Sequence, residues 1–186
     1  MNFFNKVSIL CSLFIFSVFP YVSLQAGGST NSCESQIDDD GNIFMVWQEN
    51  MNNHSVVYAK QKFVNGNWSE SVKISDDEFS AYSPIVKTDG KGNAVALWVG
   101  LSENCSDSAL LGCTIFLGEN WSPPQLISSK NANIMHNSYD VKITNEGKAI
   151  VTWNAQEFNE NVDFLTTMYV TEAELGKSWP TPVKVN

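Results

Sequence analysis

The sequence predicts an all-β protein built from three repeated four-stranded antiparallel sheets, and two recurring patterns lead to this prediction. The first is a hairpin segment that occurs as DDDGNIFMVW, DGKGNAVALW and TNEGKAIVTW, with a glycine six residues before a tryptophan in each copy. The second is a glycine-to-tryptophan turn after each hairpin, in GNWSESVKIS, GENWSPPQLIS and GKSWPTPVKVN. The repeat-defining residues are Gly41, Trp47, Trp68, Gly92, Trp98, Trp121, Gly147, Trp153 and Trp179.

The spacing of the copies indicates the architecture. The hairpin tryptophans Trp47, Trp98 and Trp153 are 51 and 55 residues apart, and the repeats cover about 32–80, 81–130 and 137–186. A period near 50 residues is typical of solenoid and propeller proteins.

Each strand of a repeat has its own signature. In the second copy, residues 83–88 form a first strand, a turn of Asp, Gly and Asn follows, and residues 94–99 form a second strand with apolar residues on both faces. The first copy shows the same pattern, with Ile43, Met45 and Trp47 on one face and Phe44 and Val46 on the other. Both strands are expected to be covered on both sides, and small residues such as Ala94, Ala96 and Ala149 allow a neighbouring sheet to approach. Third strands are predicted at 56–63 and 166–173, and short fourth strands at 71–75 and 182–186. A four-stranded sheet repeated in this way is a β-propeller blade.

The combination of a D-x-x-G-N-A-x-A-x-W hairpin with a G-x-W-S-x-x-V-x-I-S turn resembles the degenerate blades of sialidase-like, BNR-repeat β-propellers. The resemblance covers residues 32–186, but the aspartate that defines the family's Asp-box turn is missing. Sialidases bind the substrate carboxylate with three arginines and use a tyrosine nucleophile backed by a glutamate. This chain contains no arginine, and Tyr58, Tyr82, Tyr139 and Tyr169 occupy repeated strand positions that suit packing. The resemblance therefore implies the fold without sialidase activity.

The N-terminus predicts export. Lys6 precedes an apolar run from residue 7 to 18, and small residues end this region at Ala26. This is the layout of a secretory signal peptide, expected to span residues 1–26 and to leave a repeat domain at 27–186 in an extracellular or periplasmic compartment. The run is shorter than the roughly 20 apolar residues of a membrane span, so no transmembrane segment is predicted.

Charge and composition exclude some partners. The net charge is −9, and all eleven basic residues are lysines. An acidic chain without a basic cluster is not expected to bind nucleic acid. Without arginine, the chain also lacks the planar guanidinium groups that form paired hydrogen bonds with carboxylates and phosphates.

The number of repeats predicts a partner. Closed propellers typically have four to eight blades, whereas the sequence supplies three. A homodimer forming a six-bladed ring, an open fan and a surviving piece of a longer ancestral protein are the three interpretations. Because an open fan leaves apolar faces uncovered, we expect self-association or another blade-completing partner.

Few residues suggest other chemistry. Cys105 and Cys113 flank a short loop and are predicted to form a disulfide, which leaves Cys33 either buried in a first strand or available to bridge to another chain. The stretch 38–42 (DDDGN) has the oxygen-rich look of a calcium loop, but turn chemistry explains it more simply. His54 and His136 have no metal-ligand spacing and are expected in exposed loops. No catalytic residue, cofactor or metal site is predicted.

These observations lead to two hypotheses of function. The first is a secreted, non-enzymatic repeat protein that binds a protein or a glycan through the loops between second and third strands: QENMNNHS, GLSENCSDSALLG and NAQEFNENVDFL. The second is a remnant or weak carbohydrate-active hydrolase, for which carboxylates such as Glu49, Glu103 or Glu157 would have to converge about 5 to 10 Å apart. A structural surface protein without a small ligand is the third, simpler possibility.

Overall fold

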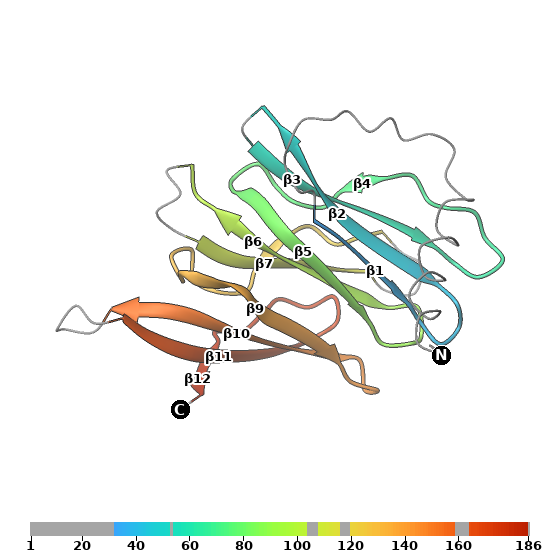
Figure 1. The fold of residues 1–186 in the computed structure, drawn as a ribbon. Coiled ribbons are helices and arrows are strands. Elements are labelled where there is room, and N and C mark those ends of the chain that lie inside the picture. Colours follow the sequence, from blue (N-terminus) through green and yellow to red (C-terminus); the bar gives the residue numbers. More distant parts are fainter. Residues whose placement is uncertain (1–31, 53, 104–107, 116–119, 159–163, 186) are drawn as a thin grey trace, which may run out of the picture.

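The computed structural model describes residues 32–52, 54–103, 108–115, 120–158 and 164–185. These residues form three four-stranded antiparallel sheets (Figure 1). The first sheet holds β1 (Cys33–Ile37), β2 (Ile43–Met51), β3 (His54–Lys62) and β4 (Val72–Lys73). The second holds β5 (Ser80–Thr88), β6 (Ala94–Leu101), β7 (Ser108–Ile115) and β8 (Gln125–Leu126), and the third holds β9 (Ile134–Ile143), β10 (Lys148–Phe158), β11 (Phe164–Glu174) and β12 (Val183–Val185). The predicted all-β fold of propeller-type blades is confirmed.

The three sheets, which we call blades 1, 2 and 3, are layered face to face in chain order (Figure 1). Strand order within each blade follows the sequence. The first strands β1, β5 and β9 contact one another in turn, so the blades fan out from a shared inner edge. None of the described residues forms a helix long and apolar enough to cross a membrane.

The hairpin between the first and second strands depends on its glycine. Gly41, Gly92 and Gly147 have φ values of +86°, +88° and +78°, in the left-handed region that residues with a Cβ rarely adopt. In blade 1, the Asp38 carboxylate accepts hydrogen bonds from the backbone N–H groups of Asn42 (2.8 Å) and of Gly92 in the next blade (3.0 Å). Its oxygens thus hold two adjacent turns together, which fits the turn interpretation of residues 38–42.

Burial along the second strands distinguishes the middle blade from the outer two. Residues of β6 are buried on both faces, from Ala94 to Gly100. In β2 only alternate residues such as Phe44 and Val46 are buried, and in β10 the buried residues are those on the opposite face. The prediction of a strand covered on both sides is therefore correct for blade 2 and wrong for blade 1. Ile43, Met45 and Trp47 of blade 1 are only half-buried because no described blade precedes them.

Two apolar cores join the blades. Phe44, Val46 and Val57 of blade 1 pack with Trp98 and other residues of blade 2. The other face of blade 2 packs on blade 3 around Leu97, Leu110 and Trp153. Trp98 and Trp153 therefore each face the preceding blade.

The turn tryptophans follow the same rule as the hairpin tryptophans. Trp121 of blade 2 is buried in the core with blade 1, and its indole Nε1 donates to Gln61 Oε1 of blade 1 at 3.2 Å. Trp179 of blade 3 packs at the edge of the core with blade 2. The interfaces between blades are thus built from equivalent positions in each repeat.

Several local predictions need correction or remain open. The first proposed loop, QENMNNHS, is largely strand, since β2 and β3 are paired as far as Met51 and His54. His54 accordingly begins β3 and is half-buried, and His136 lies within β9; neither is a loop residue. Cys33 is a free, exposed thiol at the start of β1. Cys105 lies outside the described residues, and Cys113 pairs with Ala96 across the β6–β7 hairpin, so the disulfide stays a prediction.

Candidate functional site

An open groove of about 840 Å³ lies between blades 2 and 3 at the outer side of the fan. Blade 2 supplies one wall from β8 and the connection that follows it. Blade 3 supplies the other wall from β10, β11 and the segment leading into β12. The lining residues are Leu126, Ile127, Ser128, Ser129, Asn131, Ala132 and Asn133 from blade 2, and Trp153, Gln156, Glu157, Tyr169, Trp179, Pro180, Thr181, Pro182 and Lys184 from blade 3.

Aromatic rings form the apolar part of this groove. Trp153 and Tyr169 are stacked, with ring centroids 5.5 Å apart and planes 13° apart. Trp179 adds a third, half-buried aromatic side chain at the groove. Such rings offer flat surfaces with a negative electrostatic face, to which the weakly positive C–H groups of a ligand are attracted.

The register of the third blade explains why these side chains meet. Trp153 of β10 lies opposite Tyr169 of β11, and Tyr169 lies opposite Lys184 of β12. Residues directly opposite in antiparallel strands point to the same face and are close enough to interact. The three side chains therefore form a row across the blade, on the face turned toward blade 2.

Glu157 is the carboxylate of the groove, and three hydrogen bonds hold it. Lys184 Nζ and Thr167 Oγ1 donate to its Oε2 at 2.8 Å and 3.1 Å, and the Tyr169 hydroxyl donates to its Oε1. The bond from Lys184, followed by that from Tyr169, lowers the pKa of Glu157 below its ordinary value. Desolvation, followed by the hydrogen bond to Glu157, raises the pKa of the Tyr169 phenol. Glu157 is thus held as an anion, and Tyr169 is held in its neutral form.

The Trp153 indole Nε1 is buried and has no hydrogen-bond partner among the described residues. In blade 1 the equivalent Trp47 Nε1 donates to Glu49 Oε1 at 2.7 Å, whereas Ala155 occupies the position of Glu49 in blade 3. A buried donor without an acceptor costs about 1–3 kcal/mol. One buried donor beside the groove is therefore left without an acceptor among the described residues.

The polar wall of the groove combines amides and hydroxyls. Asn131, Asn133 and Gln156 place amide side chains along it. The backbone is already organised there, because Gln156 N–H donates to the Asn133 carbonyl at 3.0 Å and extends the pairing of β9 with β10. The buried Ser128 hydroxyl accepts from Leu110 N–H at 2.8 Å. A rigid wall bearing neutral donors and acceptors suits a polar, uncharged ligand.

The groove contains one of the three carboxylates that the hydrolase hypothesis would bring together. Glu157 lines the groove, whereas Glu49 and Glu103 do not. Glu49 belongs to β2 in blade 1, and Glu103 is exposed just after β6. Among the described residues, no group of three or more His, Cys, Asp or Glu side chains is arranged to hold a metal ion.

Tyr169, Lys184 and the wall around Asn131 are functional candidates that the sequence did not predict as a site. An alignment of the repeats could have indicated two of these residues, because it places Tyr58 and Lys73 of blade 1 at the positions of Tyr169 and Lys184. Tyr58 stacks on Trp47 with centroids 5.8 Å apart, and Tyr139 donates to the Ser83 carbonyl. The prediction of packing roles for the tyrosines agrees with these contacts.

Comparison with known protein families gives no match, and no curated protein matches the chain. In structure, the chain is similar to an α-L-arabinanase from Penicillium chrysogenum complexed with arabinobiose, with a TM-score of 0.53 and 9% identity over 83% of this chain and 50% of that one. It is also similar to a glycosyl hydrolase from Bacteroides ovatus, with a TM-score of 0.50 and 12% identity over 84% of this chain and 49% of that one. The chain spans about half the length of these proteins, and at such identities the similarity shows a β-propeller-like fold alone.

Proposed function

We propose that this chain is a secreted, non-enzymatic β-propeller-type protein that binds glycans in the groove between blades 2 and 3. The observation that carries the proposal is the half-buried Tyr169 ring, held by its stack on the buried Trp153 and bordered by Trp179 and a wall of amides. Sugar rings present C–H groups on their faces and hydroxyls on their edges. The faces would lie on the rings of Tyr169 and Trp179, and the edges would meet Asn131, Gln156 and Glu157.

A glycan fits the groove better than a protein surface does. The volume of about 840 Å³ falls in the range of roughly 300–1,000 Å³ that small-ligand pockets occupy. A stable protein partner typically covers about 800 Å² of surface on each side, much of it flat. The groove is concave and combines apolar rings with neutral hydrogen-bonding groups, which favours one or a few sugar units.

Binding is favoured over hydrolysis by the state of Glu157. Glycoside hydrolysis ordinarily requires two carboxyl groups, one of them a general acid with a raised pKa. Glu157 is the one carboxylate among the described residues of the groove, and its pKa is lowered by Lys184 and Tyr169. The similarity to two glycosyl hydrolases keeps a remnant hydrolase of sialidase-like fold as the alternative.

A glycan array with the exported chain, followed by calorimetry with a monovalent hit, tests the proposal. Trp179→Ala is expected to weaken binding at least about tenfold, because aromatic anchors dominate such contacts. Trp68→Ala is the matched control, since Trp68 is the equivalent turn tryptophan of blade 1 and does not line the groove. Equal losses in both variants would contradict binding in the groove. Release of new reducing ends from the glycan that the array identifies would contradict a non-enzymatic function.

The proposal includes the compartment and the partner. Residues 1–26 are proposed to be removed on export, so the N-terminal residue of the exported protein is expected to be Gly27. The uncovered outer faces of blades 1 and 3 support the proposal of a blade-completing partner.

A further inference from the structure

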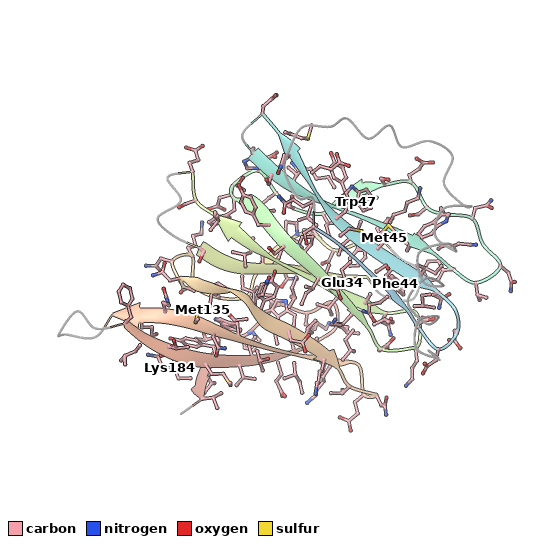
Figure 2. All side chains as sticks on the ribbon, viewed as in Figure 1. Glu34, Phe44, Met45, Trp47, Met135 and Lys184 are labelled. Atoms are coloured by element: carbon pink, nitrogen blue, oxygen red, sulfur yellow. The ribbon has the colours of Figure 1, made fainter. Side chains whose placement is uncertain are left out.

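Two sheet faces lack a covering layer among the described residues, and they lie at opposite ends of the fan. Met45 and Trp47 on β2 belong to the outer face of blade 1, far from Lys184 in blade 3 (Figure 2). Ile43 and Tyr58 share this outer face, and all four side chains are half-buried. The outer face of blade 3 contains Ile150, Thr152, Val170 and the 47% exposed Met168.

The covered interface between blades 1 and 2 shows what such faces require. There, the large Phe44 and Val46 of blade 1 pack in one core with the small Ala94 and Ala96 of blade 2. The pairing of Trp47 with Tyr58 and of Trp98 with Leu111 defines equivalent positions in each blade. A bulky face therefore meets a small one.

On the two outer faces, residue size changes in the opposite direction at the equivalent positions. At the positions of Phe44 and Val46, blade 3 has the smaller Ile150 and Thr152. At the positions of Ala94 and Ala96, blade 1 has the larger Ile43 and Met45. The smaller residues on the outer face of blade 3 thus offset part of the volume that the larger residues add on the outer face of blade 1.

Charge is matched in the same way. In the covered interface, Gln61 of blade 1 accepts a hydrogen bond from the indole of Trp121 in blade 2. Glu172 of blade 3 occupies the position of Gln61, and Trp68 of blade 1 occupies that of Trp121. The Lys60 ammonium lies 5.7 Å from the centroid of the Trp68 ring. Glu172 is exposed and forms an ion pair with Lys148 of its own blade at 3.6 Å. Docking the faces as in the covered interface brings Glu172 to Trp68 and Lys60.

We propose that a second copy of this chain covers both outer faces, with blade 3 of each copy packed on blade 1 of the other. The two copies are related by a two-fold axis, and each contact joins two different surfaces. The three blades that the structure describes in each copy then form a ring of six, within the usual range of propellers. This interface lies away from the groove between blades 2 and 3 and does not depend on glycan binding there.

Sedimentation of the exported chain over a range of concentrations tests the dimer. Lys60→Glu and Glu172→Lys are each expected to weaken dimerisation at least about tenfold, because each places like charges together. The double variant with both changes restores the opposite pair and is expected to recover most of the loss. Lys177→Glu, an exposed change outside both faces, is the control and leaves the dimer intact.

Alkylation of Cys33 gives a second, independent readout. Cys33 lies opposite Trp47, on the outer face of blade 1, and is exposed in the single chain. Its alkylation, followed on the peptide by mass spectrometry, is expected to slow as the concentration rises through the dimer range. A monomer at every concentration, single variants that dimerise as the parent does, or a double variant without recovery would overturn the proposal.

Discussion

At the scale of single residues, the surroundings of Glu157 support the proposal of a binding groove over a hydrolytic one. Its carboxylate is surrounded by donors from β11 and β12, and the nearest cation is Lys184 at 2.8 Å. Donors that bind the charged form lower the pKa of a carboxyl group. Tyr169 is a poor nucleophile, because desolvation and then its hydrogen bond to Glu157 raise its phenol pKa. Both groups suit holding a ligand rather than breaking a glycosidic bond.

Substituting the donors around Glu157 is expected to change its pKa in a fixed order. Lys184→Met should raise the pKa of Glu157 most, Tyr169→Phe should raise it less, and Thr167→Val should raise it least, following the sizes of the hydrogen-bond effects. Titration of the side-chain carboxyl carbon by NMR measures each value. Lys177→Met is the control. An unchanged Glu157 pKa in Lys184→Met would contradict the assigned network.

The lowered pKa also sets the pH dependence of stability. A group with a lower pKa in the folded state stabilises the fold at pH values above its unfolded pKa, and this stabilisation is lost as the pH falls through the folded pKa. Unfolding by urea should therefore show a smaller loss of stability on acidification in Lys184→Met than in the parent chain. Equal losses in the two proteins would show that the contact is not maintained in solution.

At the scale of elements, the middle blade is built for close approach on both faces. A Cβ added to Gly112 in β7 would lie 2.7 Å from Leu97 Cδ2, 2.8 Å from the Ala96 carbonyl oxygen and 2.8 Å from Ile127 Cδ1. The carbonyl belongs to the paired strand and cannot move without disturbing the sheet. Gly112 is therefore required by packing, whereas Gly147 is required by its positive φ.

Two glycine substitutions separate these causes. Gly112→Ala is expected to destabilise the fold by about 1–3 kcal/mol or more, the cost of overpacking a core. Gly147→Ala meets no atom within 4 Å and should cost only about 1–2 kcal/mol for its left-handed backbone. Urea unfolding compares the two variants. A Gly112→Ala protein as stable as the parent would contradict the tight packing of β7 on β6 and Ile127.

Strands and turns could be predicted from the sequence because their causes are local. Gly41 and its counterparts mark positive φ, and alternation of apolar residues marks the second strands. Whether a face is covered could not be predicted, since β2 is apolar on both faces, like β6, and differs only in having no described blade before it. The groove depends on register between distant segments, such as Tyr169 with Lys184 and Gln156 with Asn133, and no local pattern encodes those contacts.

At the scale of the whole molecule, the fan has one fully enclosed blade between two blades with open faces. Trp98 in the middle blade is 1% exposed, whereas the equivalent Trp47 in blade 1 is only half-buried. The same residue type at the same repeat position is therefore a core residue in one blade and a surface residue in another. Position in the fan decides which of the two roles a repeat residue has.

This difference predicts unequal costs for equivalent substitutions. Trp98→Ala should destabilise the fold by about 3–5 kcal/mol, the usual cost of truncating a buried aromatic residue. Trp47→Ala should cost clearly less when measured at concentrations low enough to keep the chain monomeric. Urea unfolding of both variants tests the difference. Equal losses would mean that another layer covers blade 1 in the single chain.

The most direct test of the glycan groove uses the indole N–H signals of the tryptophans in an NMR titration with oligosaccharides. Each repeat supplies one hairpin and one turn tryptophan, so the signals report on separate parts of the fan. We predict that a bound glycan shifts the signals of Trp153 and Trp179, while those of Trp47 and Trp98 stay in place. Shifts confined to Trp47 and Trp68, or no shift with any glycan that the array identifies, would contradict a binding site between blades 2 and 3.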